Sequence, residues 1–131
     1  LLNLGHTFGH ALESACGYGA RLLHGEAVSI GMVMAFDYSV AAGLCKPEDA
    51  ARLKRHLAAV GLPTSPTQIP GMTWNADDLI SRMSTDKKVA DGNLTFILAH
   101  ALGDCFVTQD INLSQLKLTI SESIGDSLFA D

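Results

Sequence analysis

The first residues of the chain alternate between apolar and polar types with the period of a helix, which we predict to run from about Leu4 to Ala15. At about 100° per residue, the apolar side chains take one face: Leu4, Phe8, Ala11, Leu12 and Ala15. The polar side chains take the other face: Asn3, His6, His10 and Glu13. A solvated helix face usually carries Lys, Glu and Gln, so two imidazoles and an amide are more typical of a site.

Two glycines, Gly5 and Gly9, lie along one edge of this predicted helix. Each weakens a helix by roughly 1 kcal/mol relative to alanine. Because glycine has no Cβ, we expect a second backbone or a ligand to come close at this edge.

A second helix is predicted from about Glu26 to Ala42, and it is apolar nearly all round, which is typical of a central helix. His24 lies at or just before its start, and Glu26 in its first turn complements the positive helix end. Pro47 begins a third helix, which Gly61 closes. Three prolines and a glycine predict a loop over residues 62–74.

Asn75 is predicted to cap a fourth helix that runs toward residues 85–88. Strands are predicted at Leu94–Leu98 and Cys105–Thr108, joined through residues 100–104.

A last helix, capped by Asn112 or Ser114, is predicted to end near Ile124. The chain as a whole therefore reads as mainly α, a bundle-like helical domain with one small β-hairpin. Its last third is predicted to serve packing more than chemistry.

The composition fits one domain with its own core, because 131 residues with 47% apolar and only 18% charged residues bury a sizeable core. Mean hydropathy is +0.21, which is apolar for a soluble domain and fits a piece that packs against something else. The net charge of −5 with scattered lysines and arginines argues against a nucleic-acid partner. No run reaches the ~18 apolar residues of a membrane span.

Cys16, Cys45 and Cys105 show no metal-type spacing, so we interpret them as buried free thiols in a reducing compartment, the cytoplasm. The chain begins with neither an initiator methionine nor a basic signal region. Because its most informative motif opens at residue 3, we expect it to be the C-terminal portion of something larger.

The histidines are the strongest candidates for chemistry. His6 and His10 have the i, i+4 spacing that lets two imidazoles reach one divalent ion, and His24 could return to the same place as a further ligand. Neutral imidazole suits Zn²⁺ or a similar metal, and Glu13 or Glu26 could orient an imidazole as an acceptor. The alternative is that these are core histidines with ordinary hydrogen bonds.

His56 and His100 have no such surroundings, and we interpret both as structural. The run Asp86-Lys87-Lys88 is a weak motif, because a charge cluster after a helix is usually a solvated helix end. As the alternative, a lysine there could hold a phosphate or carboxylate as a point charge, and Asn3 could contact the same ligand.

Five segments, in this order, resemble 3-dehydroquinate synthase over essentially the whole chain. They are Leu-Asn-Leu-Gly-His-Thr-Phe-Gly-His-Ala-Leu-Glu at 2–13, Gly-Tyr-Gly at 17–19, Leu-His-Gly-Glu-Ala-Val-Ser-Ile-Gly-Met at 23–32, Gly-Leu-Pro at 61–63 and Asp-Lys-Lys at 86–88. The resemblance implies the C-terminal, mainly helical domain of that enzyme, over residues 1–131. An N-terminal α/β domain that binds NAD⁺ would lie upstream, and the family is commonly a homodimer.

The resemblance also implies roles for individual residues. A metal, usually Zn²⁺ (or Co²⁺), would be held by His6 and His24 together with a glutamate from the other domain. His10 would then be a catalytic residue that contacts substrate, which differs from the pairing that helical spacing alone favours. Asn3 and Lys87 match positions that bind the anionic groups of the substrate, and Lys88 is adjacent.

The implied reaction converts 3-deoxy-D-arabino-heptulosonate 7-phosphate, a small sugar phosphate, into 3-dehydroquinate and phosphate in the shikimate pathway of aromatic amino acid biosynthesis. The enzyme would be a phosphate-eliminating lyase that uses NAD⁺ and a divalent metal, and this chain alone is expected to be inactive. Two alternatives are another sugar-phosphate cyclase on the same scaffold and a helical metal-binding module without catalysis.

Overall fold

The computed structural model describes residues 5–17, 24–69, 71–84 and 96–125. Within these ranges it contains five α-helices, one short 3₁₀ helix and one two-stranded antiparallel sheet. The helices are α1 (His6–Ala15), α2 (His24–Ala41), α3 (Pro47–Ala59), α4 (Ala76–Ser84) and α5 (Leu113–Ser123), with η1 at Pro66–Gln68. The strands are β1 (Phe96–Ala101) and β2 (Asp104–Thr108). The predicted mainly α class with one hairpin is confirmed.

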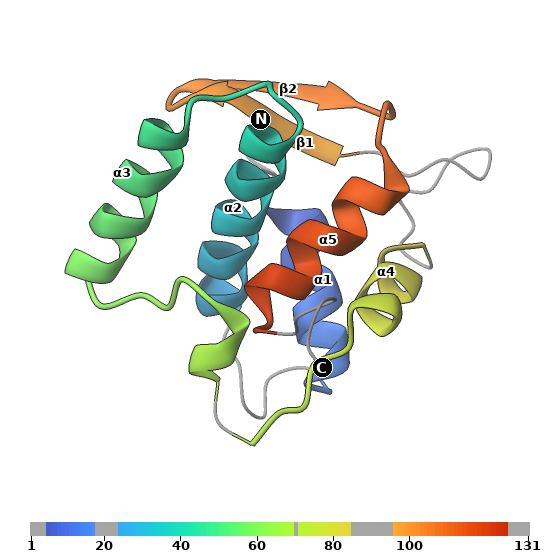
Figure 1. Cartoon of the computed structure of the whole chain (residues 1–131). Coiled ribbons are helices and arrows are strands. Elements are labelled where there is room, and N and C mark those ends of the chain that lie inside the picture. The colour runs from blue at the N-terminus through green and yellow to red at the C-terminus, as the bar shows by residue number, and fades with distance from the viewer. Residues whose placement is uncertain (1–4, 18–23, 70, 85–95, 126–131) are drawn as a thin grey trace.

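Helix α2 is the centre of the domain, as predicted from a sequence that is apolar nearly all round. It packs against α1, α3, α5 and strand β1, while α4 packs against α1 and α5. The hairpin lies across one end of the helices (Figure 1). None of the described helices is long and apolar enough to span a membrane.

The main core lies where α1, α2, α4 and α5 meet beneath the first strand. Its largest fully buried side chains come from all of these elements: Phe8, Leu12, Ile30, Met34, Leu79, Met83, Phe96, Leu98, Leu116 and Ile120. A smaller cluster of Phe36, Cys45, Ala50 and Ala99 joins α2 and α3 to the hairpin. Burial of these apolar surfaces holds the layers together.

Helix boundaries agree with the predicted ones to within two residues. Helix α1 begins at His6 rather than Leu4. Gly5 is its N-cap residue, and the left-handed conformation of Gly5, with φ of 84°, is not helical. Helix α2 begins at His24, the earlier of the two starts considered. Asn112, and not Ser114, caps α5, since its side-chain oxygen accepts from the backbone N–H of Gln115.

The hairpin is the least accurate prediction. Strand β1 runs from Phe96 to Ala101, later than the predicted Leu94–Leu98, and Leu94 itself lies outside the described residues. The connection is tighter than residues 100–104, because Ala101 pairs with Asp104 across a turn in which Gly103 has a φ of 84°. His100 is therefore a strand residue.

The loop between α3 and α4 contains η1, which the sequence analysis did not predict. Ser65 and Gln68 form a capping box around it, a pattern visible in the sequence as Ser-x-x-Gln. Trp74 lies further along this loop and donates from Nε1 to the carbonyl of Pro66 at 2.9 Å. The three cysteines are free as predicted, but only Cys16 and Cys45 are buried, while Cys105 on the outer strand is half-buried.

Candidate functional site

Helices α1 and α2 are in backbone contact, and glycines make this contact possible. A Cβ built on Gly31 would lie 2.1 Å from the carbonyl oxygen of Gly5, and one on Gly9 would lie 3.0 Å from that of Ala27. The glycine edge predicted on α1 therefore receives a second backbone, that of α2. This close approach fixes the start of α1 against the first half of α2.

Three imidazoles come together at the α1–α2 contact. His6 is the first residue of α1, His10 follows one turn later, and His24 is the first residue of α2. The ring centres of His6 and His10 are 5.4 Å apart, those of His6 and His24 are 5.6 Å apart, and those of His10 and His24 are 6.3 Å apart. The structure thus brings the three predicted histidines into one group.

One of these imidazoles has a carboxylate partner. The Nδ1 atom of His24 lies 3.0 Å from Oε1 of Glu13, on the last turn of α1. The Glu13 side chain is 12% exposed and that of His24 is 59% exposed, so a nearly buried carboxylate contacts a solvent-exposed imidazole. Glu26 lies in the first turn of α2, where it was predicted.

The residues present fit a metal ion on two counts. The Nδ1 atom of His6 is buried and has no hydrogen-bond partner, which is an unusual state for a ring nitrogen. Two imidazoles on one tetrahedral zinc have ring centres about 5 Å apart, given Zn–N distances of about 2.0–2.1 Å. The His6–His24 and His6–His10 pairs both come close to this separation. Among the described side chains, no group of three His, Cys, Asp or Glu is arranged to hold an ion.

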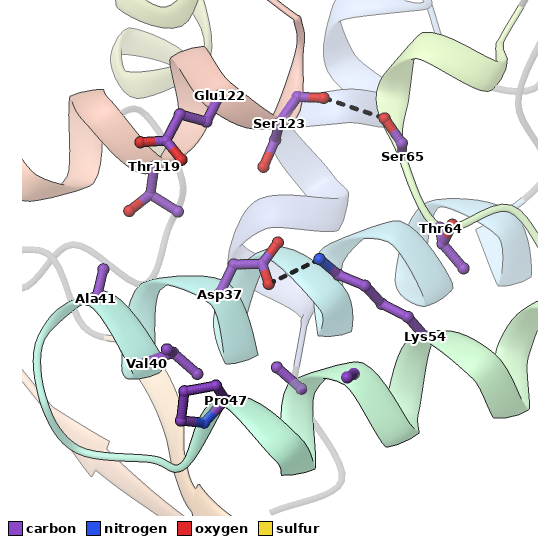
Figure 2. Close-up of a pocket in the computed structure, with 12 residues that line it drawn as sticks. Asp37, Val40, Ala41, Pro47, Lys54, Thr64, Ser65, Thr119, Glu122 and Ser123 are labelled. Carbon is purple, nitrogen blue, oxygen red and sulfur yellow. Dashed lines mark hydrogen bonds and ion pairs between the residues drawn. The ribbon is translucent and has the colours of Figure 1, made fainter.

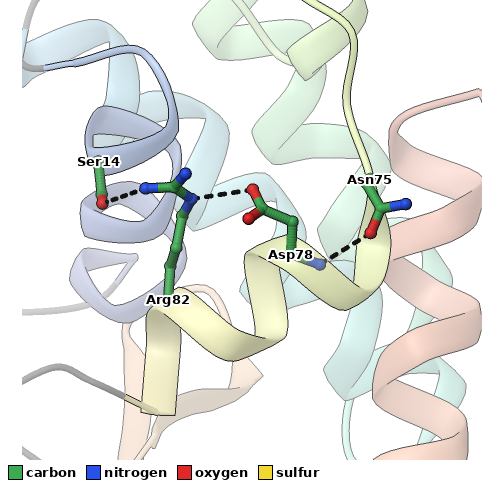
Figure 3. Close-up of polar contacts among 4 residues, drawn as sticks. All are labelled: Ser14, Asn75, Asp78 and Arg82. Atoms are coloured by element: carbon green, nitrogen blue, oxygen red, sulfur yellow. Dashed lines mark hydrogen bonds and ion pairs between the residues drawn. The ribbon is translucent and has the colours of Figure 1, made fainter.

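Two of the predicted substrate-binding residues, Asn3 and Lys87, lie outside the described residues, as does Lys88. The helix that precedes the lysines is anchored to α1 (Figure 3). Arg82 on α4 donates to Oγ of Ser14 on α1 at 2.7 Å and to Asp78 at 2.9 Å, while Asn75 caps the start of α4 through the N–H of Asp78. These contacts fix α4 beside the helix that carries His6 and His10.

The two remaining histidines lie apart from this group. The ring of His100 stacks on Phe106 with centres 4.1 Å apart, and its Nδ1 lies 3.3 Å from the carbonyl oxygen of Leu44. His56 is exposed in the last turn of α3.

A groove of about 560 Å³ between α2, α3 and α5 is a feature that the sequence analysis missed (Figure 2). Asp37 and Lys54 form an ion pair of 3.1 Å inside it, and Thr64, Ser65 and Glu122 also line it. Burial raises the pKa of Asp37, the charge of Glu122 raises it further, and Lys54 acts in the opposite direction. A lone aspartate within the apolar stretch of α2 was the signal available in the sequence.

Two solved structures share this fold over about a third of their length. The 2-epi-5-epi-valiolone synthase of Streptomyces hygroscopicus subsp. jinggangensis, solved with NAD⁺ and Zn²⁺ bound, superposes with a TM-score of 0.76 at 23% identity, over 95% of this chain and 32% of that one. A 2-deoxy-scyllo-inosose synthase complexed with carbaglucose-6-phosphate, NAD⁺ and Co²⁺ gives a TM-score of 0.74 at 23% identity, over 92% of this chain and 34% of that one.

Residues 1–89 match the 3-dehydroquinate synthase C-terminal family, and the chain belongs to that family. The 3-dehydroquinate synthase of Rhodospirillum rubrum is 52% identical over 126 residues, which are 95% of this chain and 33% of the relative. The corresponding protein of Ruegeria pomeroyi is 56% identical over 125 residues, 95% of this chain and 34% of the relative. The chain thus spans about a third of the length of these relatives.

Proposed function

We propose that this chain is the C-terminal third of a 3-dehydroquinate synthase, which converts 3-deoxy-D-arabino-heptulosonate 7-phosphate into 3-dehydroquinate and phosphate. The convergence of His6, His10 and His24 at the α1–α2 contact is the observation that carries the proposal. Family membership and relatives of that name at about half identity support it. The reaction places the protein in the shikimate pathway.

A further domain would complete the site. The chain covers only about a third of its relatives, and its structural neighbours were solved with NAD⁺ and with Zn²⁺ or Co²⁺. We propose that NAD⁺ binds mainly to an N-terminal domain, which also supplies a glutamate ligand. Zn²⁺ or Co²⁺ would then lie between that domain and this chain, and a homodimer would form chiefly through the other domain.

His6 and His24 would hold the metal, with His10 beside them. A bound divalent ion supplies Lewis acidity, which lowers the pKa of a substrate hydroxyl and polarises a carbonyl oxygen. His10 lies one helical turn from His6 and would contact the substrate directly, donating or accepting a proton at a ring nitrogen. It is therefore the catalytic histidine in this proposal.

Asn3 and Lys87 would fix the anionic groups of the substrate. An ammonium group binds phosphate or carboxylate as a point charge, and an amide adds directional hydrogen bonds. Helix α4, held to α1 by the Arg82–Ser14 contact, leads into the segment that contains Lys87. Correct placement of both groups would limit the substrate to one pose.

A chimera tests this function. The matching C-terminal third of the Rhodospirillum rubrum enzyme is replaced by this chain, and phosphate release from 3-deoxy-D-arabino-heptulosonate 7-phosphate is measured. We expect the chimera to turn over substrate, and the chain alone to release no phosphate and to bind Zn²⁺ weakly. A folded, metal-loaded chimera without activity would contradict the function, and would favour the non-catalytic metal-binding module. Brisk turnover by the chain alone would contradict the need for a second domain.

Histidine variants of the chimera test the assigned roles. His6→Ala and His24→Ala should each lose both the metal and the activity, whereas His10→Ala should keep the metal and turn over slowly. His56→Ala, at an exposed histidine of α3, is the matched control and should change neither. Metal analysis decides between the roles, because a metal-free His10 variant beside fully loaded His6 or His24 variants would reverse the assignment.

A further inference from the structure

Glu13 occupies a position that helix energetics and burial both disfavour. It lies in the last turn of α1, where the negative end of the helix dipole opposes a carboxylate. Its side chain is only 12% exposed, and a carboxylate with so little access to water is costly unless a donor compensates it. A residue that breaks two local rules at one place is a candidate for a functional role.

The compensating donor is His24. The 3.0 Å contact joins Oε1 of Glu13 to Nδ1 of His24, and an ionised carboxylate can only accept a hydrogen bond. The proton of a neutral His24 ring must therefore be on Nδ1, which leaves the lone pair on Nε2. The contact thus fixes both the orientation of the ring and the nitrogen that is free to bind another group.

His24 needs such a partner more than the other two histidines do. Its side chain is 59% exposed at the first residue of α2, so little packing restricts its rotamer. His6 and His10 are half-buried on α1, whose backbone is held against α2. Glu26 cannot take the place of Glu13, because residues two apart on a helix do not face each other.

We propose that Glu13 is a positioning residue, which sets the tautomer and the direction of the His24 imidazole so that Nε2 is presented to the metal. This inference rests on the proposed metal-binding role of His24. Carboxylates that hold the second nitrogen of a metal-binding imidazole typically strengthen metal affinity ten- to a hundred-fold.

The first test is independent of any metal. Nitrogen-15 NMR of the metal-free 131-residue chain, recorded at a pH where the spectrum itself shows a neutral His24 ring, reports which ring nitrogen carries the proton. We expect Nδ1 of His24 to be protonated in the unmodified chain, with its signals assigned through a His24→Gln variant. Glu13→Ala should move the proton toward Nε2, and Glu13→Gln, whose amide oxygen still accepts, should retain much of the original pattern. A proton on Nε2 in the unmodified chain would overturn the inference.

The second test measures Zn²⁺ affinity of the chimera by competition with a chromophoric chelator. Glu13→Ala should weaken binding about ten- to a hundred-fold, and Glu13→Gln by less. Glu26→Gln, which removes the same charge nearby without touching the contact, should change affinity by less than about twofold. Equal losses of Zn²⁺ affinity in the Glu13→Gln and Glu26→Gln variants would show that only the net negative charge near the site matters. That result would overturn the inference.

The two tests separate failure of this inference from failure of the proposed function. An unmodified chimera that binds no Zn²⁺ would remove the metal role of His24, and with it the inference about the metal. A chimera that binds Zn²⁺ tightly with or without Glu13 would leave the proposed function intact and remove only the positioning role. Circular dichroism of each variant shows whether it folds, and Glu13→Gln preserves side-chain size where Glu13→Ala fails to fold.

Discussion

The two sides of α2 differ in how closely their neighbours approach. Toward α1, glycines bring two backbones into contact, and the three histidines and Glu13 gather along this contact. Toward α3 and α5, a groove of about 560 Å³ remains, and the Asp37–Lys54 pair lies within reach of water. The groups proposed for chemistry lie on the side where the backbones of α1 and α2 are in direct contact.

This difference predicts a gradient in the effect of substitutions. Where two backbones touch, an added atom must move a helix, because packed interiors have few voids. Where water reaches a polar group, the loss of its partner is largely made good by solvent. Four substitutions test this gradient, in order of decreasing expected effect on the free energy of unfolding.

Gly31→Ala should be the most destabilising. Its Cβ would lie 2.1 Å from the carbonyl oxygen of Gly5, so α1 and α2 must separate, at a cost of about 3 kcal/mol. Urea unfolding followed by circular dichroism measures this. Gly25→Ala on the same helix is the control, because a Cβ there meets nothing within 4 Å, and its stability should be unchanged or slightly raised. Equal losses in both variants would contradict the close-contact explanation.

Ser39→Ala should come second. The buried Oγ of Ser39 donates to the carbonyl of Ala35 at 2.7 Å and accepts from the N–H of Ala99 at 3.1 Å, which joins α2 to β1. Removing it leaves a buried N–H without its partner, and we expect a loss of about 2 kcal/mol. Ser81→Ala, at an exposed position of α4, should cost far less in the same unfolding experiment. A loss below that of Ser81→Ala would disprove this role.

Ser14→Ala should have a smaller effect. It removes the acceptor of a 2.7 Å hydrogen bond from Arg82, but Asp78 still holds the guanidinium and the site is half-buried. We expect a loss of roughly 1 kcal/mol. An Asp78→Asn variant and the double variant complete the comparison. Additive losses would show that the two contacts act independently, whereas a larger combined loss would show that each compensates for the other.

Asp37→Asn should have the smallest effect, and the effect should depend on pH. Burial raises the pKa of Asp37 above its ordinary value of 3.8, so the folded chain holds this proton more tightly than the unfolded chain. Its contribution to stability is therefore fully present below that ordinary value and is lost as the pH rises through the folded pKa. The Asn variant lacks this loss and should gain stability relative to the parent as pH rises.

Unfolding of both chains at several pH values between about 3 and 7 checks this sign. Asp110→Asn, at an exposed position after β2, is the control and should follow the parent at all of them. A variant that loses stability relative to the parent as pH rises would show that attraction to Lys54 outweighs burial.

The helices and the histidine group could be predicted because their signals are local. Helical spacing places His6 and His10 on one face, and the mostly apolar stretch after Glu26 predicts a central helix. The partner of Glu13 could not be predicted, because spacing along α1 does not say where the first turn of α2 lies. The Asp37–Lys54 pair was missed for the same reason, since it joins two helices.

The hairpin was misplaced because the stretch from Leu94 to Ala101 is mostly apolar and contains no Gly or Pro, so its sequence does not mark where pairing begins. The position of the strand is set instead by its pairing with β2 and by the tight turn at Gly103. The η1 helix was predictable in principle from Ser65 and Gln68, but three nearby prolines favoured a plain loop.

Trp74 is the single tryptophan of the sequence, and its indole nitrogen is tied to the carbonyl of Pro66 beside the main core. Its fluorescence emission therefore reports one place, the connection between α3 and α4, while circular dichroism reports all the helices at once. A red shift that precedes the loss of ellipticity would mean that this connection detaches before the bundle melts. Coincident curves would mean that the connection and the bundle unfold as one cooperative unit.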